Sequence, residues 1–442
     1  MSHESRSTAA QERAAHLDNA ELSQLEASRA RKAVVAASLG NAMEWFDIIV
    51  YAFFAVVISK NYFEGAEGHG NEYVGLLLTF GTFALSYMVR PLGAMVIGHY
   101  GDRRGRKAAL SLTIGLMTLG VAIMAFAPTY ASIGIAAPLL ILLARLIQGF
   151  SAGGEFGSAT AFLTENAEHK KAYYASWQVA TQGVSMFLAA AFGWALNTLI
   201  STEALYSWGF RIPFIFGMLI GPIGYYIRMH MDDTPEFAEA DTVKSPLGTT
   251  FAHHFGRVLT AAACVGVATM SVYLITYMPT MAQKNLDMPA YSGYVGAFVA
   301  GVVTFLVAPQ VGHLADRVGS TSVMLPTAVV GAIVAMPLFQ LLTSHPTLLV
   351  LTVVEVCVGL LMAFYFAPLP SLMSAMFPVE IRTTGMSLAY NIGVTLMGGL
   401  APIFLTWLVT NHGLVSPSWY YMLIAGISII GLVIARKVFR QA

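Results

Sequence analysis

The chain has 442 residues, of which 56% are hydrophobic and only 11% are charged, and its formal net charge is zero. Soluble proteins carry roughly a quarter charged residues, so the composition excludes an ordinary soluble enzyme and indicates a membrane protein. The zero net charge excludes a basic field for nucleic acid. Cys264 and Cys357 lie inside apolar runs, and we expect free thiols there rather than a disulfide or a metal pair.

The first 32 residues are polar and end in Arg29, Arg31 and Lys32. The apolar run that follows is too long, and this leader too extended, for a cleaved signal peptide. We therefore interpret residues 1–32 as a cytoplasmic tail.

Twelve apolar segments follow, each long enough to cross a bilayer, since a spanning helix needs about 20 apolar residues. The longest polar stretch after the tail, residues 230–256, falls at mid-chain. It predicts a cytoplasmic linker between two six-helix bundles, 33–229 and 257–442. The expected spans are 33–58, 73–100, 108–126, 136–163, 173–200, 210–229, 258–282, 291–315, 322–343, 348–376, 383–410 and 418–438.

The charges of the connections are distributed unevenly between the two sides of these spans. With both termini inside, the outer connections hold only Lys60, Lys284 and Arg211, whereas the remaining Lys and Arg of the connections lie inside. Lys and Arg accumulate in short cytoplasmic loops. The pattern predicts a multi-pass protein of the inner membrane with both termini in the cytoplasm.

A basic turn separates the second and third spans, GHYGDRRGRK (Gly98 to Lys107). It supplies small residues where two helix ends approach closely, and an Asp and an Arg able to pair. A weaker copy, GHLADRVG (Gly312 to Gly319), follows the eighth span. The repeat indicates two related halves, and a parallel repeat of this kind places a binding site near the midplane between them.

These motifs resemble the major facilitator superfamily of secondary transporters. GNAMEWFD (Gly40 to Asp47), RLIQGFSAGGE (Arg145 to Glu155) and WGFRIPF (Trp208 to Phe214) are similar to its metabolite:proton symporter family, whose members import citrate, 2-oxoglutarate, shikimate, proline and betaine. The resemblance implies an all-α membrane protein with twelve transmembrane helices in two pseudo-symmetric bundles. It implies no enzymatic activity and no cofactor, and we expect a monomer. It also implies gating contacts for Asp102, Arg103, Arg106, Asp316 and Arg317.

The second gating motif departs from the family pattern, because Ser320 and Thr321 stand where a basic pair is expected. A weaker second contact follows from this departure. For the substrate, SPSWYYM and RLIQGFSAGGEFGSA resemble citrate and tricarballylate carriers, whereas GNAMEWFD resembles osmolyte and 2-oxoglutarate carriers. We expect proton-coupled import of a citrate-like organic acid. The alternative is a proline/betaine symporter, and a drug antiporter or a membrane sensor is less favoured.

Charges within the spans are costly, so each needs a partner or a watery cavity. At about 1.5 Å per residue, Glu44, Arg90 and Glu155 fall roughly 15 Å from the cytoplasmic face. Asp47 lies one turn above Glu44, and Arg145 lies nearer the periplasm. Glu44 and Asp47 suit proton coupling, and by resemblance to proton-coupled sugar porters Asp47 and Arg145 occupy the helices of an acid–arginine couple. The alternative is a static network of ion pairs.

Arg90 and Arg145 are the candidate anchors for an anionic substrate, because a guanidinium grips a carboxylate with two hydrogen bonds. The alternative is that the acids of the cluster occupy both arginines. Glu155 is interpreted as structural. Glu355, at a level nearer the periplasm, has no assigned role, and the two alternatives for it are proton sensing and simple contact with water. No spacing indicates a metal site or a phosphate loop for ATP. Polar and aromatic residues expected around the substrate are Gln178, Gln182, Tyr277 and Asn391, with Trp177, Tyr273 and Tyr390.

Overall fold

The computed structural model describes residues 41–64, 71–104, 106–153, 155–156, 160, 163–164, 170–229, 250, 253–378 and 381–439. Within these ranges the side chains of residues 98–99, 101–110, 220 and 223–229 are not described. The predicted tail, 1–32, and nearly all of the predicted linker, 230–256, lie outside the described residues. Every regular element in the described part of the chain is helical. Cys264 and Cys357 are both free, as predicted.

The apolar segments form helices close to their predicted limits. Eight helices in the described part are long and apolar enough to cross a membrane, and the helix Asn41–Phe53 with α3 makes a ninth, bent by 66°. The shorter apolar helices Ser111–Phe126, Ala136–Ala152 and Gly209–Leu219 lie on the remaining three predicted spans. The elements before residue 230 are α3 (Ala55–Tyr62), α4 (Glu72–Arg104), α5 (Arg106–Phe126), α6 (Tyr130–Ile133), α7 (Ala136–Ala152), α9 (Lys171–Leu199), α10 (Thr202–Ser207), η1 (Gly209–Arg211) and α11 (Ile212–Met229).

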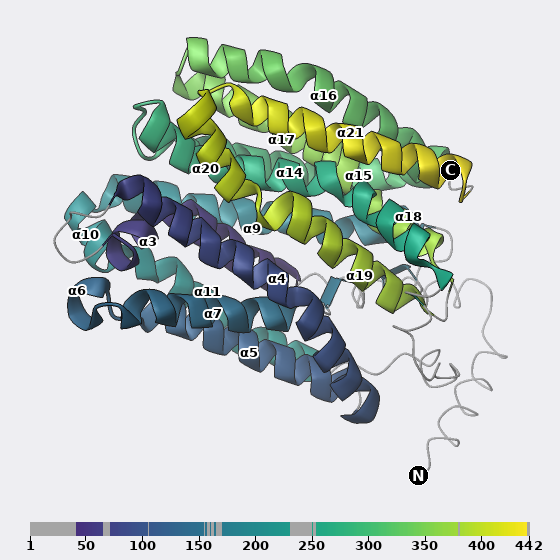
Figure 1. Cartoon of the computed structure of the whole chain (residues 1–442), viewed down its shortest axis with the longest axis horizontal. Coiled ribbons are helices and arrows are strands. Elements are labelled where there is room, and N and C mark those ends of the chain that lie inside the picture. Colours follow the sequence, from purple (N-terminus) through teal and green to yellow (C-terminus); the bar gives the residue numbers. More distant parts are fainter. Residues whose placement is uncertain are drawn as a thin grey trace, which may run out of the picture.

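The helices after residue 250 form a second group. Its members are α14 (Phe255–Asn285), α15 (Ser292–Val318), α16 (Ser320–Ser344), α17 (Leu348–Phe366), α18 (Leu369–Met376), α19 (Arg382–Val394), η3 (Thr395–Gly399), α20 (Ala401–His412) and α21 (Ser416–Lys437). In the first group α4 packs on α7, and α5 on α7 and α11; in the second α14 packs on α17, α19 and α21 (Figure 1). Two helices of the first group make most of the contacts between the groups: α9 packs along α15 and also on α17 and α18, and α4 packs on α19, η3 and α20.

The contact between α9 and α15 is made by small residues. A Cβ atom placed on Gly183 of α9 would lie 2.7 Å from the carbonyl oxygen of Gly301 on α15. One placed on Gly301 would lie 2.7 Å from the backbone nitrogen of Phe187. Small residues allow helix backbones to approach closely in a membrane, where packing replaces the hydrophobic drive. The two groups therefore touch backbone to backbone along this line.

Three spans that the sequence predicted as continuous are interrupted. The first bends by 66° between the helix Asn41–Phe53 and α3. The tenth consists of α17 and α18, which meet at Pro368. The eleventh consists of α19 and α20 joined by the π-helical turn η3. Such turns occur mostly inside α-helices, frequently at functional sites. Here the turn packs Gly398 against Tyr273 and Gly399 against the ring of Tyr87.

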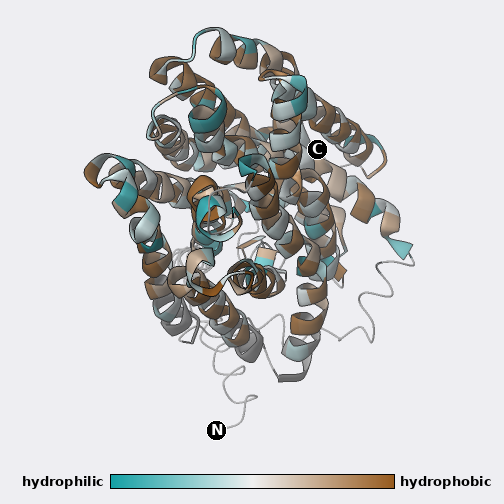
Figure 2. Cartoon of the chain, turned by 60° about the vertical axis from the view of Figure 1, so that its left-hand side comes forward, coloured by the Kyte–Doolittle hydropathy of each residue, from teal (hydrophilic) through white to brown (hydrophobic). Residues whose placement is uncertain are grey.

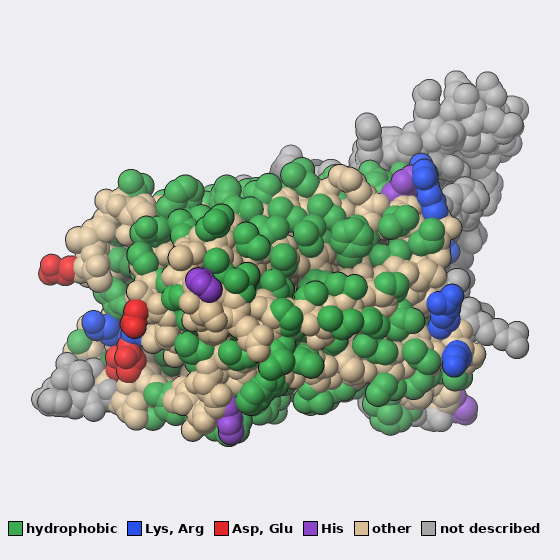
Figure 3. Space-filling view, turned by 90° about the horizontal axis from the view of Figure 1, so that it is seen from above, with side chains coloured by type: hydrophobic (Ala, Val, Ile, Leu, Met, Phe, Trp, Pro, Cys, Tyr) green, Lys and Arg blue, Asp and Glu red, His purple; other side chains and the backbone are tan. Residues whose placement is uncertain are grey.

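The outer surface is apolar between two charged ends. Figure 2 shows hydrophobic residues along most of the helices. Figure 3 shows Lys and Arg at one end of a face, and Asp and Glu together with a basic side chain at the other. Large side chains such as Leu139, Ile333 and Leu349 are 59%, 67% and 74% exposed. This surface suits lipid, in which helices satisfy their own backbone groups. We call the end with Arg317, Arg436 and Lys437 the basic end, and the other the opposite end.

Candidate functional site

The first buried ion pair joins the helix Asn41–Phe53 to α4. Arg90 Nη2 lies 3.0 Å from Glu44 Oε1, and the two side chains are 4% and 9% exposed. The guanidinium carbon of Arg90 lies 4.0 Å from the ring centroid of Tyr87, which precedes it by three residues. A cation over an aromatic face is stabilised by the ring quadrupole. Arg90 is thus held by one carboxylate and one ring.

The second ion pair joins the same helix to α7. Arg145 Nη1 lies 3.1 Å from Asp47 Oδ2 and donates a hydrogen bond of 2.8 Å to Gln148 Oε1. The guanidinium also lies over the rings of Tyr51, at 4.3 Å, and Phe83, at 5.2 Å. The estimated depth placed Arg145 nearer the periplasm than the acids, whereas the resemblance to sugar porters coupled it with Asp47. The structure brings Arg145 and Asp47 into contact. One helical turn separates Glu44 from Asp47, so the two pairs are stacked along one helix face.

Glycines of the RLIQGFSAGGE motif bring these helices together. A Cβ atom on Gly149 would overlap the carbonyl of Ser86, and one on Gly153 would overlap the carbonyl of Arg90. Backbone contact between α7 and α4 is therefore possible only where a side chain is missing. This close approach sets both arginines beside the helix that carries Glu44 and Asp47.

The Arg90 pair borders the second group of helices. The hydroxyl of Tyr273 on α14 donates a hydrogen bond to the hydroxyl of Tyr87 on α4, and Thr395 Oγ1 of η3 donates to the Tyr87 carbonyl at 3.1 Å. Tyr273 and Tyr390 lie near enough to interact electrostatically with Arg90. Arg90 is therefore next to the junction of the two groups, whereas Arg145 is enclosed by residues of the first.

Span eleven reaches across this junction as well. The ring of Tyr390 stacks on Phe156, with centroids 3.5 Å apart and planes 4° apart. Asn391 Nδ2 donates to the carbonyl oxygens of Gly153 and Ser387, each at 2.8 Å. The sequence required a partner for this buried amide, and the structure supplies one from each group of helices.

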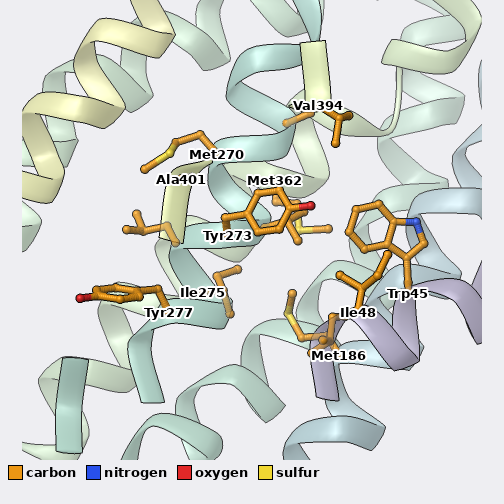
Figure 4. Close-up of a cluster of buried hydrophobic side chains, with 14 of the residues drawn as sticks. Trp45, Ile48, Met186, Met270, Tyr273, Ile275, Tyr277, Met362, Val394 and Ala401 are labelled. Carbon is orange, nitrogen blue, oxygen red and sulfur yellow. The ribbon is translucent and has the colours of Figure 1, made fainter. Parts of the chain in front are cut away.

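The glutamines of α9 differ from each other. Gln178 Nε2 donates to Thr160 Oγ1 at 3.2 Å, whereas both amide atoms of Gln182 are buried without a partner among the described residues. Met186, one turn further along α9, lies with Trp45, Tyr273 and Met362 in a cluster of buried side chains (Figure 4). An unpaired buried amide is costly, and Gln182 is the one of these two glutamines whose amide has no partner among the described residues.

The remaining predicted residues are placed as follows. Tyr277 is buried, with its ring 6.1 Å from that of Phe80. Trp177 packs edge-on against Tyr173, and Glu155 is half-buried. Their proposed roles stay predictions.

Asp316 joins the two groups at the basic end. Its Oδ1 and Oδ2 accept from the backbone nitrogens of Ala172, at 2.8 Å, and Tyr173, at 3.0 Å. A carboxylate at a helix N-terminus accepts hydrogen bonds from the free N–H groups and interacts favourably with the positive end of the helix dipole. Arg317 instead contacts His313 of its own helix, at 2.9 Å. The side chains of Asp102, Arg103 and Arg106, at the junction of α4 and α5, lie outside the description.

The opposite end is bridged too. Lys284 of α14 forms an ion pair with Glu72 of α4, and the hydroxyl of Tyr294 on α15 donates to the carbonyl of Phe53 at 2.8 Å. Contacts between the two groups therefore exist at both ends, with the two ion pairs buried between them.

The comparisons with known proteins agree with this architecture. The model of the Major Facilitator Superfamily matches residues 37–402 and 298–442. The chain belongs to this superfamily. It is 32% identical over 414 residues to a citrate-proton symporter of Klebsiella pneumoniae, which covers 93% of this chain and 92% of that protein. It is also 32% identical over 428 residues to a proline/betaine transporter of Escherichia coli (strain K12), covering 92% and 83%.

A solved structure supports the fold independently. The crystal structure of a D-xylose-proton symporter superposes with a TM-score of 0.72 at 15% identity, covering 92% of this chain and 97% of that one. The curated relatives are transporters rather than enzymes. The chain is accordingly a multi-pass transporter of the inner membrane, and the predicted family and fold class are confirmed.

Sequence reasoning found the four charges but missed their neighbours. Tyr87, Tyr51 and Gln148 line the arginines, yet none was singled out. Tyr87 precedes Arg90 by three residues and Gln148 follows Arg145 by three, so each shares a helix face with its arginine. That spacing was a usable signal.

Proposed function

We propose that the chain is a proton-coupled symporter that imports a small metabolite bearing a carboxylate, with citrate-like acids as the first candidate. The bundles 33–229 and 257–442 would alternate in exposing the site, in a monomer whose basic end and both termini face the cytoplasm. The observation that carries the proposal is the buried Arg90–Glu44 pair at the junction of the two groups. The named citrate-proton symporter among the relatives supports the substrate class.

The pair supplies a coupling mechanism. As long as Glu44 is ionised, its carboxylate occupies the guanidinium of Arg90. A proton on Glu44 removes that charge and frees Arg90, whose Nε already lacks a partner among the described residues, to bind a substrate carboxylate with two hydrogen bonds. Proton and substrate then favour each other's binding by the same factor.

The Asp47–Arg145 pair has a separate role in this proposal. Arg145 is enclosed by Asp47, Gln148 and Tyr51, so we assign it to proton coupling with Asp47 rather than to the substrate. The Oδ1 atom of the Asp47 carboxylate has no hydrogen-bond partner among the described residues. Asp47 is therefore the second acid able to accept a proton when the site opens.

Neutral groups complete the substrate contacts. The unpaired amide of Gln182 can accept from a hydroxyl or donate to a second carboxylate. Tyr273 and Tyr390 present hydroxyls beside Arg90. When the halves separate, the Tyr273–Tyr87 and Asn391–Gly153 hydrogen bonds would break, and their polar atoms would become available.

A zwitterionic osmolyte such as proline or betaine is the second candidate. The charges of Glu44, Asp47, Arg90 and Arg145 sum to zero when all four are ionised, so a triply charged anion would need further protons. A zwitterion needs only one guanidinium, and its cation is attracted to aromatic faces such as those beside Arg90. The proline/betaine transporters among the relatives favour the same reading.

Uptake into proteoliposomes tests both candidates. Radiolabelled citrate, tricarballylate, 2-oxoglutarate, proline and betaine would each be offered under an imposed inward proton gradient, with and without a protonophore. The variant Lys437→Gln, far from both pairs, is the control for reconstitution. Gradient-driven accumulation of the acids supports the first candidate, and that of proline or betaine the second. Uptake of none, or uptake insensitive to the protonophore, contradicts proton symport.

A further inference from the structure

Glu355 of α17 is a buried acid that the coupling mechanism does not use. Its exposure is 0%, and neither carboxyl oxygen has a partner among the described residues. Gly296 of α15 makes room for it: a Cβ atom there would lie 2.8 Å from the carboxyl carbon of Glu355. The carboxyl therefore fills a niche left by a missing side chain.

No cation or hydroxyl of the surrounding described helices reaches this carboxyl. The helices packed against α17 are α14, α15, α16, α18 and α9. Lys284 pairs with Glu72, and the hydroxyls of Tyr273, Tyr294 and Tyr365 are bonded to Tyr87, Phe53 and Cys264. The other titratable groups on these helices and on α17 itself are Arg257, Cys264, Tyr277, His313, Asp316, Arg317, Cys357, Lys171, Tyr173 and Tyr174.

An ionised carboxylate without a partner is very costly in such surroundings. No described neighbour compensates a charge at this carboxyl. Its burial and its lack of a partner therefore favour the neutral, protonated acid in this conformation.

Glu355 lies close to the contact between α15 and α9, which joins the two groups of helices. Glu355, Gly359 and Met362 share one face of α17 by their spacing, and Met362 belongs to the cluster between the two groups (Figure 4). Glu355 lies about 10 Å further toward the opposite end. Its neighbour α15 is the helix that packs on α9, where Gly193 touches the ring of Tyr294. If α9 separated from α15 at that end, water would reach the outer side of α15, and only α15 would lie between this water and the carboxyl of Glu355.

We propose that Glu355 is a second proton-binding site, in the C-terminal group of helices, that is loaded in the closed conformation and exchanges its proton when the opposite end opens. The inference rests on the proposed proton symport, to which it adds a site and a stoichiometry. The step is balanced, since the carboxylate takes up one proton to become the acid and later returns it. Each transport cycle would then carry one proton more than the Glu44 and Asp47 helix accounts for.

The protonation state can be measured without any substrate. Infrared spectra of the full-length protein in lipid would show the carbonyl stretch of a protonated carboxyl that lacks hydrogen bonds. This band should disappear in Glu355→Gln and remain in Glu44→Gln, Asp47→Asn and the control Cys357→Ala on the same helix. Should Glu355→Gln fail to fold, Glu355→Met, of similar length and apolar, replaces it.

The coupling role is tested by accumulation of radiolabelled citrate and betaine. At an imposed gradient of about one pH unit, the loss of one coupled proton lowers the limiting accumulation about tenfold. We expect that loss for Glu355→Gln and wild-type accumulation for Cys357→Ala. A band that survives in Glu355→Gln, or unchanged accumulation after the band is lost, overturns the proposal.

The two proposals can fail separately. If the wild type accumulates neither probe, proton symport of these substrates fails, and titration of the infrared band decides about Glu355 alone. A band that loses intensity as the pH rises supports an exchangeable proton on Glu355. A band that stays constant at every pH at which the protein remains folded contradicts it.

Discussion

Removal of one member of the Asp47–Arg145 pair should be more damaging than removal of both. The two side chains are each 2% exposed, and Arg145 Nη1 lies 3.1 Å from Asp47 Oδ2. In Asp47→Asn the guanidinium keeps Gln148 and the aromatic rings but loses its countercharge. Breaking a buried pair in this way costs about 3–5 kcal/mol, because an uncompensated charge stays buried.

The double variant Asp47→Asn with Arg145→Gln leaves no buried charge at this place. It should recover about 2 kcal/mol or more of the free energy of unfolding lost in Asp47→Asn, since contacting residues couple by up to about 3 kcal/mol. SDS-driven unfolding in mixed micelles, followed by tryptophan fluorescence, measures all four members of the cycle. The control is the pair Glu72–Lys284, whose side chains are 56% and 26% exposed and whose coupling should stay below about 1 kcal/mol.

The same variants separate stability from coupling. Both Asp47→Asn and the double variant should lose gradient-driven accumulation, although only the first is strongly destabilised. Additive effects within about 0.5 kcal/mol would refute the claim that the pair is buried and mutually compensating. Wild-type accumulation in the stable double variant would show instead that the pair is a static part of the bundle.

Two further outcomes follow from the contacts between the groups. Gly183→Ala should reduce uptake about tenfold or more, because its Cβ atom meets the backbone of α15, where close packing depends on small residues. The same change at Gly426, which faces open space, should leave uptake unchanged. Equal uptake in both variants would contradict the closure model. Asp316→Ala removes two acceptors from the N-terminus of α9, which costs about 1 kcal/mol. The basic end should then open more often, so a cysteine introduced at Ser374, at the same end, should be alkylated about fivefold faster. An unchanged alkylation rate would count against a gating role for Asp316.

Much of the fold was predictable because hydrocarbon imposes strict demands on a sequence. Apolar runs of sufficient length predicted the spans, and the interruptions of the first, tenth and eleventh spans were the main omissions. A break at Pro368 and a π-helical turn at Thr395–Gly399 do not change mean hydropathy. The Gly398, Gly399 and Pro402 positions were the local signal, but hydropathy windows average over them.

The members of the site were predictable, whereas their pairing was predictable only in part. A charge within a span is expensive, so Glu44, Asp47, Arg90 and Arg145 stood out in the sequence. Depth along a helix gives the level of a residue but not the rotation of the facing helix. That rotation is set by Gly149 and Gly153, which seat α7 on α4 and turn Arg145 toward Asp47. The resemblance to sugar porters had indicated the Asp47–Arg145 couple, whereas the pairing of Arg90 with Glu44 required the tertiary structure.

The central claim is that a proton on Glu44 frees Arg90 for the carboxylate of the substrate. Titration calorimetry of citrate and betaine binding, in buffers of different ionisation enthalpy and at a series of pH values, measures the protons taken up with each substrate. Wild-type affinity should rise as the pH falls, because protonated Glu44 no longer competes for Arg90. Glu44→Gln is neutral at every pH, so it should bind the accepted substrate tightly throughout and take up one proton fewer. Proton uptake in Glu44→Gln equal to that of the wild type would contradict the account.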